Sequence, residues 1–182
     1  MRYGWARTAV VLAMAAALAA CGRGAPATPD QAAADNLRAA GFFMASNGKA
    51  DGVQTLPSGV QYKVTTAGPP GGETPDGNDL VSVDYEGALT DGTVFDSSFQ
   101  RGQPAVFTLE EGISGSIIPG MREALQHMTV GDEWLVYIPP ELGYGDAATG
   151  EIPANSVLVF RLKLLAVAQA PGGSRAIATA NG

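Results

Sequence analysis

The sequence predicts an α+β domain, an antiparallel sheet of about five strands wrapped over one short helix. Two observations lead to this fold class. Several short segments alternate apolar and polar residues, which is the pattern of strands with one buried face. Only one segment in the body of the chain has helical spacing, and it is short. With 182 residues and 46% hydrophobic content, the chain can form one domain with a substantial core.

The first expected element is a short helical segment within residues 31–52. This stretch is rich in alanine, and Leu37, Phe43 and Met44 recur at roughly helical spacing. Asp30 precedes it and is expected to be the N-cap.

The body is expected to span residues 53–166. Its strands are predicted in "GVQYKV", "LVSVDYEGAL", "VFD", "PAVFTL", "EWLVYIPP" and "SVLVFRLKLLAV". The helix is predicted in "IIPGMREALQHMTVGD", beginning at Pro119 or Gly120 and ending before Gly131. The connection from Pro139 to Ser156 is long for a compact domain, and such loops are commonly functional. Residues 167–182 are expected to form a disordered tail.

Residues 1–20 are predicted to be a signal peptide. Arg2 and Arg7 precede an apolar run that is too short to span a bilayer. The run ends in "LAAC", which resembles a bacterial lipobox and implies that Cys21 is lipidated, with residues 21–30 as anchor and spacer. Several acyl chains would make a stable membrane anchor. The alternative is an ordinary signal peptide with an incidental cysteine. Gly22 after the cysteine favours the outer membrane, facing the periplasm or the surface.

The composition excludes several kinds of chemistry. A net charge of −7 makes nucleic acid a poor partner. The chain has one histidine, His127, and one cysteine, so no His/Cys metal cluster is expected. His127 is expected to have a surface or capping role at a helix end. No phosphate-binding glycine loop of the P-loop type occurs.

Asp96 stands out because "TVFDSSF" places this single carboxylate between Phe95 and Phe99. An ionised carboxylate among aromatic rings needs compensating partners. Two interpretations are open: Asp96 is a satisfied turn residue, or it is the polar part of an apolar pocket.

Several ordered motifs bear on this question: "VDYEGAL", "DGTVFDSS", "IPGMREALQHMTVGD", "IPPELGYGD" and "IPANSVLVFRLKLL". Together they resemble the FKBP-type peptidyl-prolyl cis-trans isomerases, from about Leu80 to Leu165. The segment "FFMASNGKADGVQTLPSGVQYKV" is similar to the lead-in of the macrophage infectivity potentiator-like FKBPs. The resemblance implies a rotamase that acts on proline-containing polypeptides and binds macrolide inhibitors of the FK506 and rapamycin type. It implies no metal and no cofactor.

The resemblance also assigns site residues. It implies catalytic positions for Asp96, Tyr144, Phe95 and Phe160, and a supporting role for Arg101 as the partner of Asp96. The substrate-binding positions that it implies are Tyr85, Phe107, Ile117, Ile118, Met121 and Ile152. This chain departs from the family at three places: Met121 stands where many members have Trp, Ala105 replaces an aromatic residue, and the loop around residues 147–149 lacks a histidine that some members carry.

The leading hypothesis is therefore an isomerase for exported or surface proteins. One alternative is a membrane-anchored chaperone that binds peptides with little turnover. The departures from the family pattern at Met121 and Ala105 are compatible with this alternative. Another is an envelope lipoprotein whose domain serves only as a structural platform.

Overall fold

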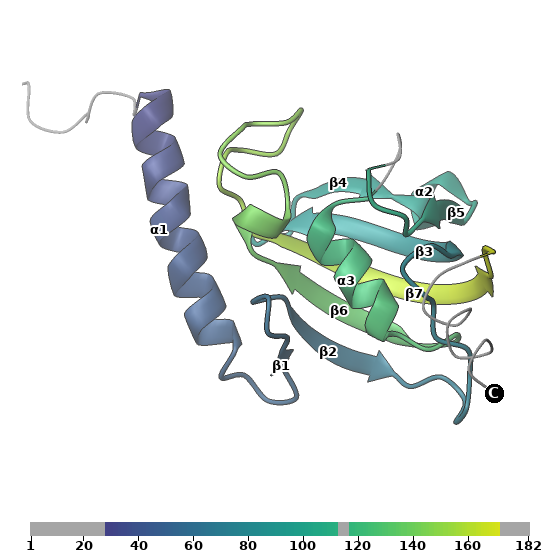
Figure 1. Cartoon of the computed structure of the whole chain (residues 1–182). Helices are drawn as coiled ribbons and strands as arrows, with labels where there is room; N and C mark the ends of the chain where they lie inside the picture. The colour runs from purple at the N-terminus through teal and green to yellow at the C-terminus, as the bar shows by residue number, and fades with distance from the viewer. Residues whose placement is uncertain (1–27, 113–116, 172–182) are drawn as a thin grey trace, which may run out of the picture.

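The computed structural model describes residues 28–112 and 117–171. It contains one antiparallel sheet in the order β1-β2-β6-β7-β3-β4, with β5 also paired to β3 (Figure 1). The elements, in chain order, are α1 (Pro29–Asn47), β1 (Gln54–Thr55), β2 (Gln61–Thr66), β3 (Leu80–Leu89), β4 (Val94–Ser97), α2 (Ser98–Arg101), β5 (Ala105–Thr108), α3 (Pro119–His127), β6 (Glu133–Ile138), η1 (Pro140–Leu142) and β7 (Leu158–Ala168).

Helix α3 crosses one face of the sheet, and the core lies between them (Figure 1). The alternation predicted in β3 and β7 places Val81, Val83, Leu162 and Leu164 in this core with no exposed surface. Leu125 of α3 is equally buried, and burial of such a side chain contributes about 1.5–3 kcal/mol. The α+β class and the position of α3 are thus as the sequence predicts.

Gly120 lets α3 approach the sheet closely. A Cβ atom at this position would lie 2.5 Å from Cγ2 of Ile138 on β6. Pro119 occupies the first turn, where its missing N–H is no loss, and the helix ends at His127 before Met128 takes an extended conformation.

Three details of the structure differ from those predicted from the sequence. Thr28, and not Asp30, is the N-cap of α1: its side chain accepts a hydrogen bond from the N–H of Gln31, and Pro29 opens the helix. The two-residue strand β1 and the short helices α2 and η1 were not expected. Strand β7 continues to Ala168 because it still pairs there with Leu80 of β3, so the predicted tail begins too early.

The predicted signal peptide and Cys21 lie outside the described residues. Within residues 28–112 and 117–171, no helix is long and apolar enough to cross a membrane.

Candidate active site

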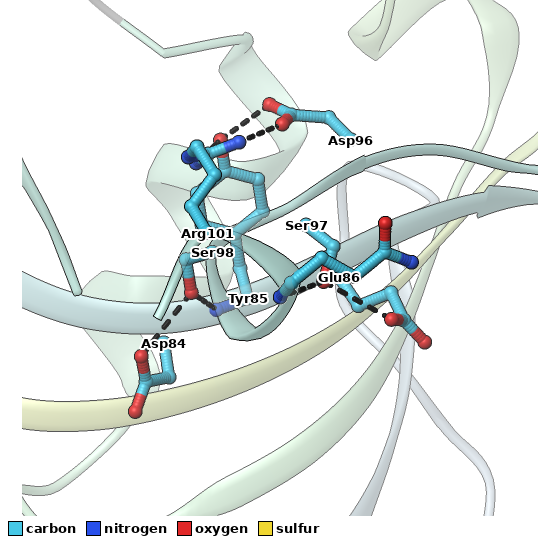
Figure 2. Close-up of polar contacts among 8 residues, drawn as sticks. Asp84, Tyr85, Glu86, Asp96, Ser97, Ser98 and Arg101 are labelled. Carbon is cyan, nitrogen blue, oxygen red and sulfur yellow. Dashed lines mark hydrogen bonds and ion pairs between the residues drawn. The ribbon is translucent and has the colours of Figure 1, made fainter. Parts of the chain in front are cut away.

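Asp96 lies in β4, and its carboxylate is bonded by two side chains (Figure 2). The Tyr85 hydroxyl donates to one carboxylate oxygen, and the Arg101 guanidinium donates to the other. Nη2 of Arg101 also donates to the Tyr85 hydroxyl oxygen over 2.9 Å, which closes a ring of three contacts. The Asp96 carboxylate therefore has two side-chain partners. Asp96 lies in a strand, so the interpretation of Asp96 as a turn residue is wrong.

The charges in this network follow from its contacts. Burial raises the pKa of Asp96, but the hydrogen bonds from Tyr85 and Arg101, with the positive charge of Arg101, outweigh burial, and the net pKa is lowered. Burial and then the hydrogen bond to Asp96 raise the pKa of Tyr85 above its ordinary value. At neutral pH Asp96 is thus a carboxylate, and Tyr85 is a neutral donor.

The Tyr85 ring forms a cluster with three further aromatic rings, those of Phe95, Phe107 and Phe160. The Phe95 ring meets the Phe160 ring edge-on, with centroids 5.7 Å apart and an interplanar angle of 81°. The Tyr85 ring lies 5.6 Å from Phe107 and 6.4 Å from Phe160. Such tilted pairs are favourable beyond their buried area. The Tyr85 side chain therefore belongs to the aromatic cluster through its ring and to the charged network through its hydroxyl.

A β-bulge at Phe95 explains how adjacent residues serve the same site. Gly87 pairs with Asp96 and Ala88 pairs with Val94, so Phe95 is the extra residue of the β3–β4 pair. In a regular strand Phe95 and Asp96 would point to opposite faces, and a bulge re-aims one of them. Phe95 contacts Phe160 while Asp96 contacts Tyr85.

Gly87 makes space for the aromatic cluster. A Cβ atom on Gly87 would lie 2.6 Å from Cε2 of Phe95 and 2.7 Å from Cε1 of Phe160. The two rings thus occupy the volume that a side chain would fill. Gly87 was not predicted as a site residue, although a glycine in the middle of a strand is a known signal of close approach.

Helix α2, which carries Arg101, is fixed to β3 by two serines (Figure 2). Oγ of Ser97 accepts a hydrogen bond from the N–H of Gln100 over 3.3 Å and donates to Glu86 over 3.1 Å. The fully buried Oγ of Ser98 accepts from the N–H of Tyr85 over 2.8 Å and donates to Asp84 over 3.2 Å.

The Ser98 hydroxyl takes the place of a neighbouring strand as a hydrogen-bond partner of β3. On this edge β3 pairs with β5 up to Val83 and with β4 from Glu86, so Asp84 and Tyr85 lie between the two pairings. The Ser98 hydroxyl satisfies the Tyr85 N–H in this interval. Neither Ser98 nor Asp84 was singled out from the sequence, because the exchange of partners along β3 carries no periodic signal.

The other predicted site residues are placed around this centre. Met121 and Ile152 are buried in the same core cluster, and Ile117 and Ile118 pack against it. Tyr144 differs, since it is 39% exposed in the loop after η1. Ala105 begins β5 beside a hollow that is lined by Arg101, Gln103 and Pro104.

The exposed His127 ends α3, as expected. In the two described stretches of the chain, no group of three or more His, Cys, Asp or Glu side chains is arranged to hold a metal ion.

Comparison with known families shows which family the chain belongs to. The family model described as FKBP-type peptidyl-prolyl cis-trans isomerase matches residues 71–165. The chain belongs to this family. A second family model, described as the domain amino-terminal to FKBP-type peptidyl-prolyl isomerase, matches residues 7–64. The resemblance to FKBPs and the fold that it implies are thereby confirmed.

Individual FKBPs give the same result. The chain is 43% identical, over 141 residues, to the FKBP-type peptidyl-prolyl cis-trans isomerase FkpA of Aeromonas hydrophila, covering 78% of this chain and 50% of that protein. It is 40% identical to the outer membrane protein MIP of Legionella longbeachae, covering 76% of this chain and 57% of that one. The chain thus spans about half the length of the curated relatives it matches.

A solved structure is matched in full. The peptidyl-prolyl cis-trans isomerase of Pseudomonas syringae pv. tomato superposes with a TM-score of 0.67 at 36% identity, covering 81% of this chain and 100% of that one.

Proposed function

We propose that this FKBP family member is a peptidyl-prolyl cis-trans isomerase that acts on exported or surface polypeptides. The observation that carries the proposal is the position of Tyr85, whose ring lies in the aromatic cluster and whose hydroxyl lies in the charged network with Asp96. An apolar cluster with an ordered polar rim suits a proline ring flanked by peptide groups.

The chemistry requires only that amide resonance be weakened. An X-Pro bond isomerises slowly because its partial double bond opposes rotation, with a barrier of about 20 kcal/mol. The twisted amide is less polar than the planar one, so a dry apolar site favours it relative to water. No covalent intermediate and no cofactor is needed.

Each site residue has a proposed role. Phe95, Phe107 and Phe160 form the cup for the proline ring, with the buried Met121 as its floor. The hydroxyl of the exposed Tyr144 and the backbone N–H of Ile118 donate hydrogen bonds to substrate carbonyls. Tyr85, Ile117 and Ile152 complete the apolar walls. Asp96, held by Arg101, orients the polar rim and takes no proton in the reaction.

The test is the cis-to-trans rate of an X-Pro tetrapeptide with and without a macrolide of the FK506 or rapamycin type. We expect acceleration that the macrolide inhibits. Tyr144→Phe removes one donor worth about 1 kcal/mol, so the rate should fall about fivefold. Asp96→Ala should lower it further while the domain stays folded.

The same variants separate this activity from a holding chaperone with little turnover. A folded domain that suppresses aggregation of an unfolded client, and is unaffected by either substitution, would favour the chaperone and reject the isomerase.

We further propose that Cys21 anchors the chain in the bacterial cell envelope, at the outer membrane. The motif before Cys21 supports this, as does the similarity to a relative that is named an outer membrane protein. Cys21→Ser should release the chain into the soluble periplasmic fraction and abolish labelling with radioactive palmitate. Retention of the variant in the membrane fraction would reject the anchor.

A further inference from the structure

Helix α1 is attached to the body through side-chain amides at both of its ends. Near its beginning, Nδ2 of Asn36 donates to the carbonyl of Ala154 over 3.0 Å. In return, Nδ2 of Asn155 donates to the carbonyl of Ala33, also over 3.0 Å. These two reciprocal hydrogen bonds, here called the amide clamp, join α1 to the loop before β7, and Figure 1 shows this loop rising beside the helix.

The clamped loop is the one that carries Tyr144 and Ile152. Backbone hydrogen bonds close this loop at two places. The N–H of Asn155 donates to the carbonyl of Gly145 over 2.8 Å, and Thr149 and Ile152 exchange hydrogen bonds of 2.9 and 3.0 Å. Asn155 thus contacts the neighbour of Tyr144 through its backbone and helix α1 through its side chain. Its φ of 58° is left-handed, a conformation that asparagine tolerates better than most residues.

Apolar packing contributes little to this end of the contact. Ala40 is the only buried residue of α1, and a cavity of about 180 Å³ lies between the helix and the loop, bordered by Asn36, Phe43 and Asn155. The amide clamp is therefore the specific connection between the helix and the loop.

We propose that helix α1 positions the substrate-binding loop, with Asn36 and Asn155 as positioning residues. The catalytic consequence rests on the proposed isomerase function. The aromatic cluster and the Asp96 network lie on β3, β4, β5, β7 and α2, which the clamp does not touch. Loss of the clamp should therefore weaken substrate binding through Tyr144 and Ile152 and leave the cup intact, so that KM rises and kcat changes little.

The chain offers matched variants. Asn36→Ala removes one amide donor and suits a helix, since alanine has the highest helix propensity. Asn155→Gly removes the other donor and keeps a residue that accepts a positive φ. The control is Asn47→Ala, which removes a hydrogen bond of 2.9 Å to Gln61 at the other end of α1. Gln61 still donates to the carbonyl of Met44 over 2.8 Å in that variant.

The first measurement is hydrogen–deuterium exchange of the loop amides in the full chain. For both Asn36→Ala and Asn155→Gly we expect about fivefold faster exchange at Gly145 and Ile152, as loss of one hydrogen bond predicts. In Asn36→Ala the amide of Asn155 should also exchange faster. For Asn47→Ala we expect no change in this loop. The second measurement is KM for an X-Pro peptide, which should rise about fivefold with the first two variants only.

Two results would overturn the proposal. One is loop exchange in Asn36→Ala that matches Asn47→Ala. The other is faster loop exchange in an active enzyme whose KM is unchanged. If the unsubstituted chain shows no isomerase activity, the exchange experiment still decides whether the clamp orders the loop, and only the proposed function is rejected.

Discussion

Replacement of Gly87 by alanine should damage the site more than the fold. The added methyl group would lie 2.6 Å from Phe95 and 2.7 Å from Phe160, against about 3.5–4.0 Å for a normal carbon contact. At least one ring must therefore move by roughly 1 Å, and overpacking of this kind costs about 1–3 kcal/mol of stability. A displacement of that size in the cup should lower kcat/KM by about 10- to 100-fold.

The assays are peptide isomerisation and urea unfolding, the latter followed by the fluorescence of Trp134, which is buried and stacked on Tyr62. Gly41→Ala is the matched control, because nothing lies within 4 Å of a Cβ atom at Gly41 in helix α1. It should be fully active and up to about 1 kcal/mol more stable. A Gly87→Ala variant with unchanged kcat/KM would show that the Phe95–Phe160 pair does not form the cup.

Three further substitutions test the polar network. Ser98→Ala leaves the buried N–H of Tyr85 without its partner and should lower the free energy of unfolding by about 1–3 kcal/mol; an unchanged urea midpoint would contradict the role of Ser98 as a substitute strand partner. Asp96→Asn should lower the pKa of Tyr85, because the carboxylate helps to raise it, and ultraviolet titration of tyrosinate against a Tyr85→Phe variant would detect the shift. In the folded chain the pKa of Asp96 is below its ordinary value of 3.8, so the ionised carboxylate stabilises the fold above that pH and this contribution is lost as the pH falls through the lower folded pKa. The loss of stability caused by Asp96→Asn should thus be constant near neutral pH and become smaller in acid. A loss that becomes larger in acid would contradict the direction of the pKa shift. Arg101→Lys keeps the charge but cannot hold Asp96 and Tyr85 together with one planar group, so macrolide affinity should fall, as isothermal titration would measure.

Local patterns made much of the fold predictable. Alternation in β3 and β7 was readable because each strand has one face on the core for most of its length. Pro119 marked the start of α3 by its own backbone chemistry, whereas the helix ends at His127, four residues before Gly131. By contrast, α2 has four residues, too few to show a helical period, and β1 has two.

One contact of the candidate site was predictable from the sequence, and the way the site is built was not. The resemblance assigned Asp96 and Arg101 to each other, and the structure brings them together. The resemblance did not assign Gly87, Ser98 or Asn155, because their roles depend on contacts with segments that are distant in the sequence. A glycine in a strand, a serine that follows another serine and an asparagine in a loop each have several ordinary explanations.

The interruption along β3 links Gly87 and Ser98 to the position of Asp96 between two phenylalanines. Where β3 leaves β5 and before it pairs fully with β4, the backbone N–H of Tyr85 needs another acceptor, and α2 supplies it through Ser98. The same short helix ends in Arg101, which compensates the charge of Asp96. The bulge at Phe95 then turns Asp96 toward Tyr85 while Phe95 fills the space left by Gly87. A continuous β3–β4 ladder without the bulge would point Phe95 and Asp96 to opposite faces, and only one of them could serve the site. The irregularity of this sheet edge is therefore what allows a carboxylate and an aromatic cup to share one site.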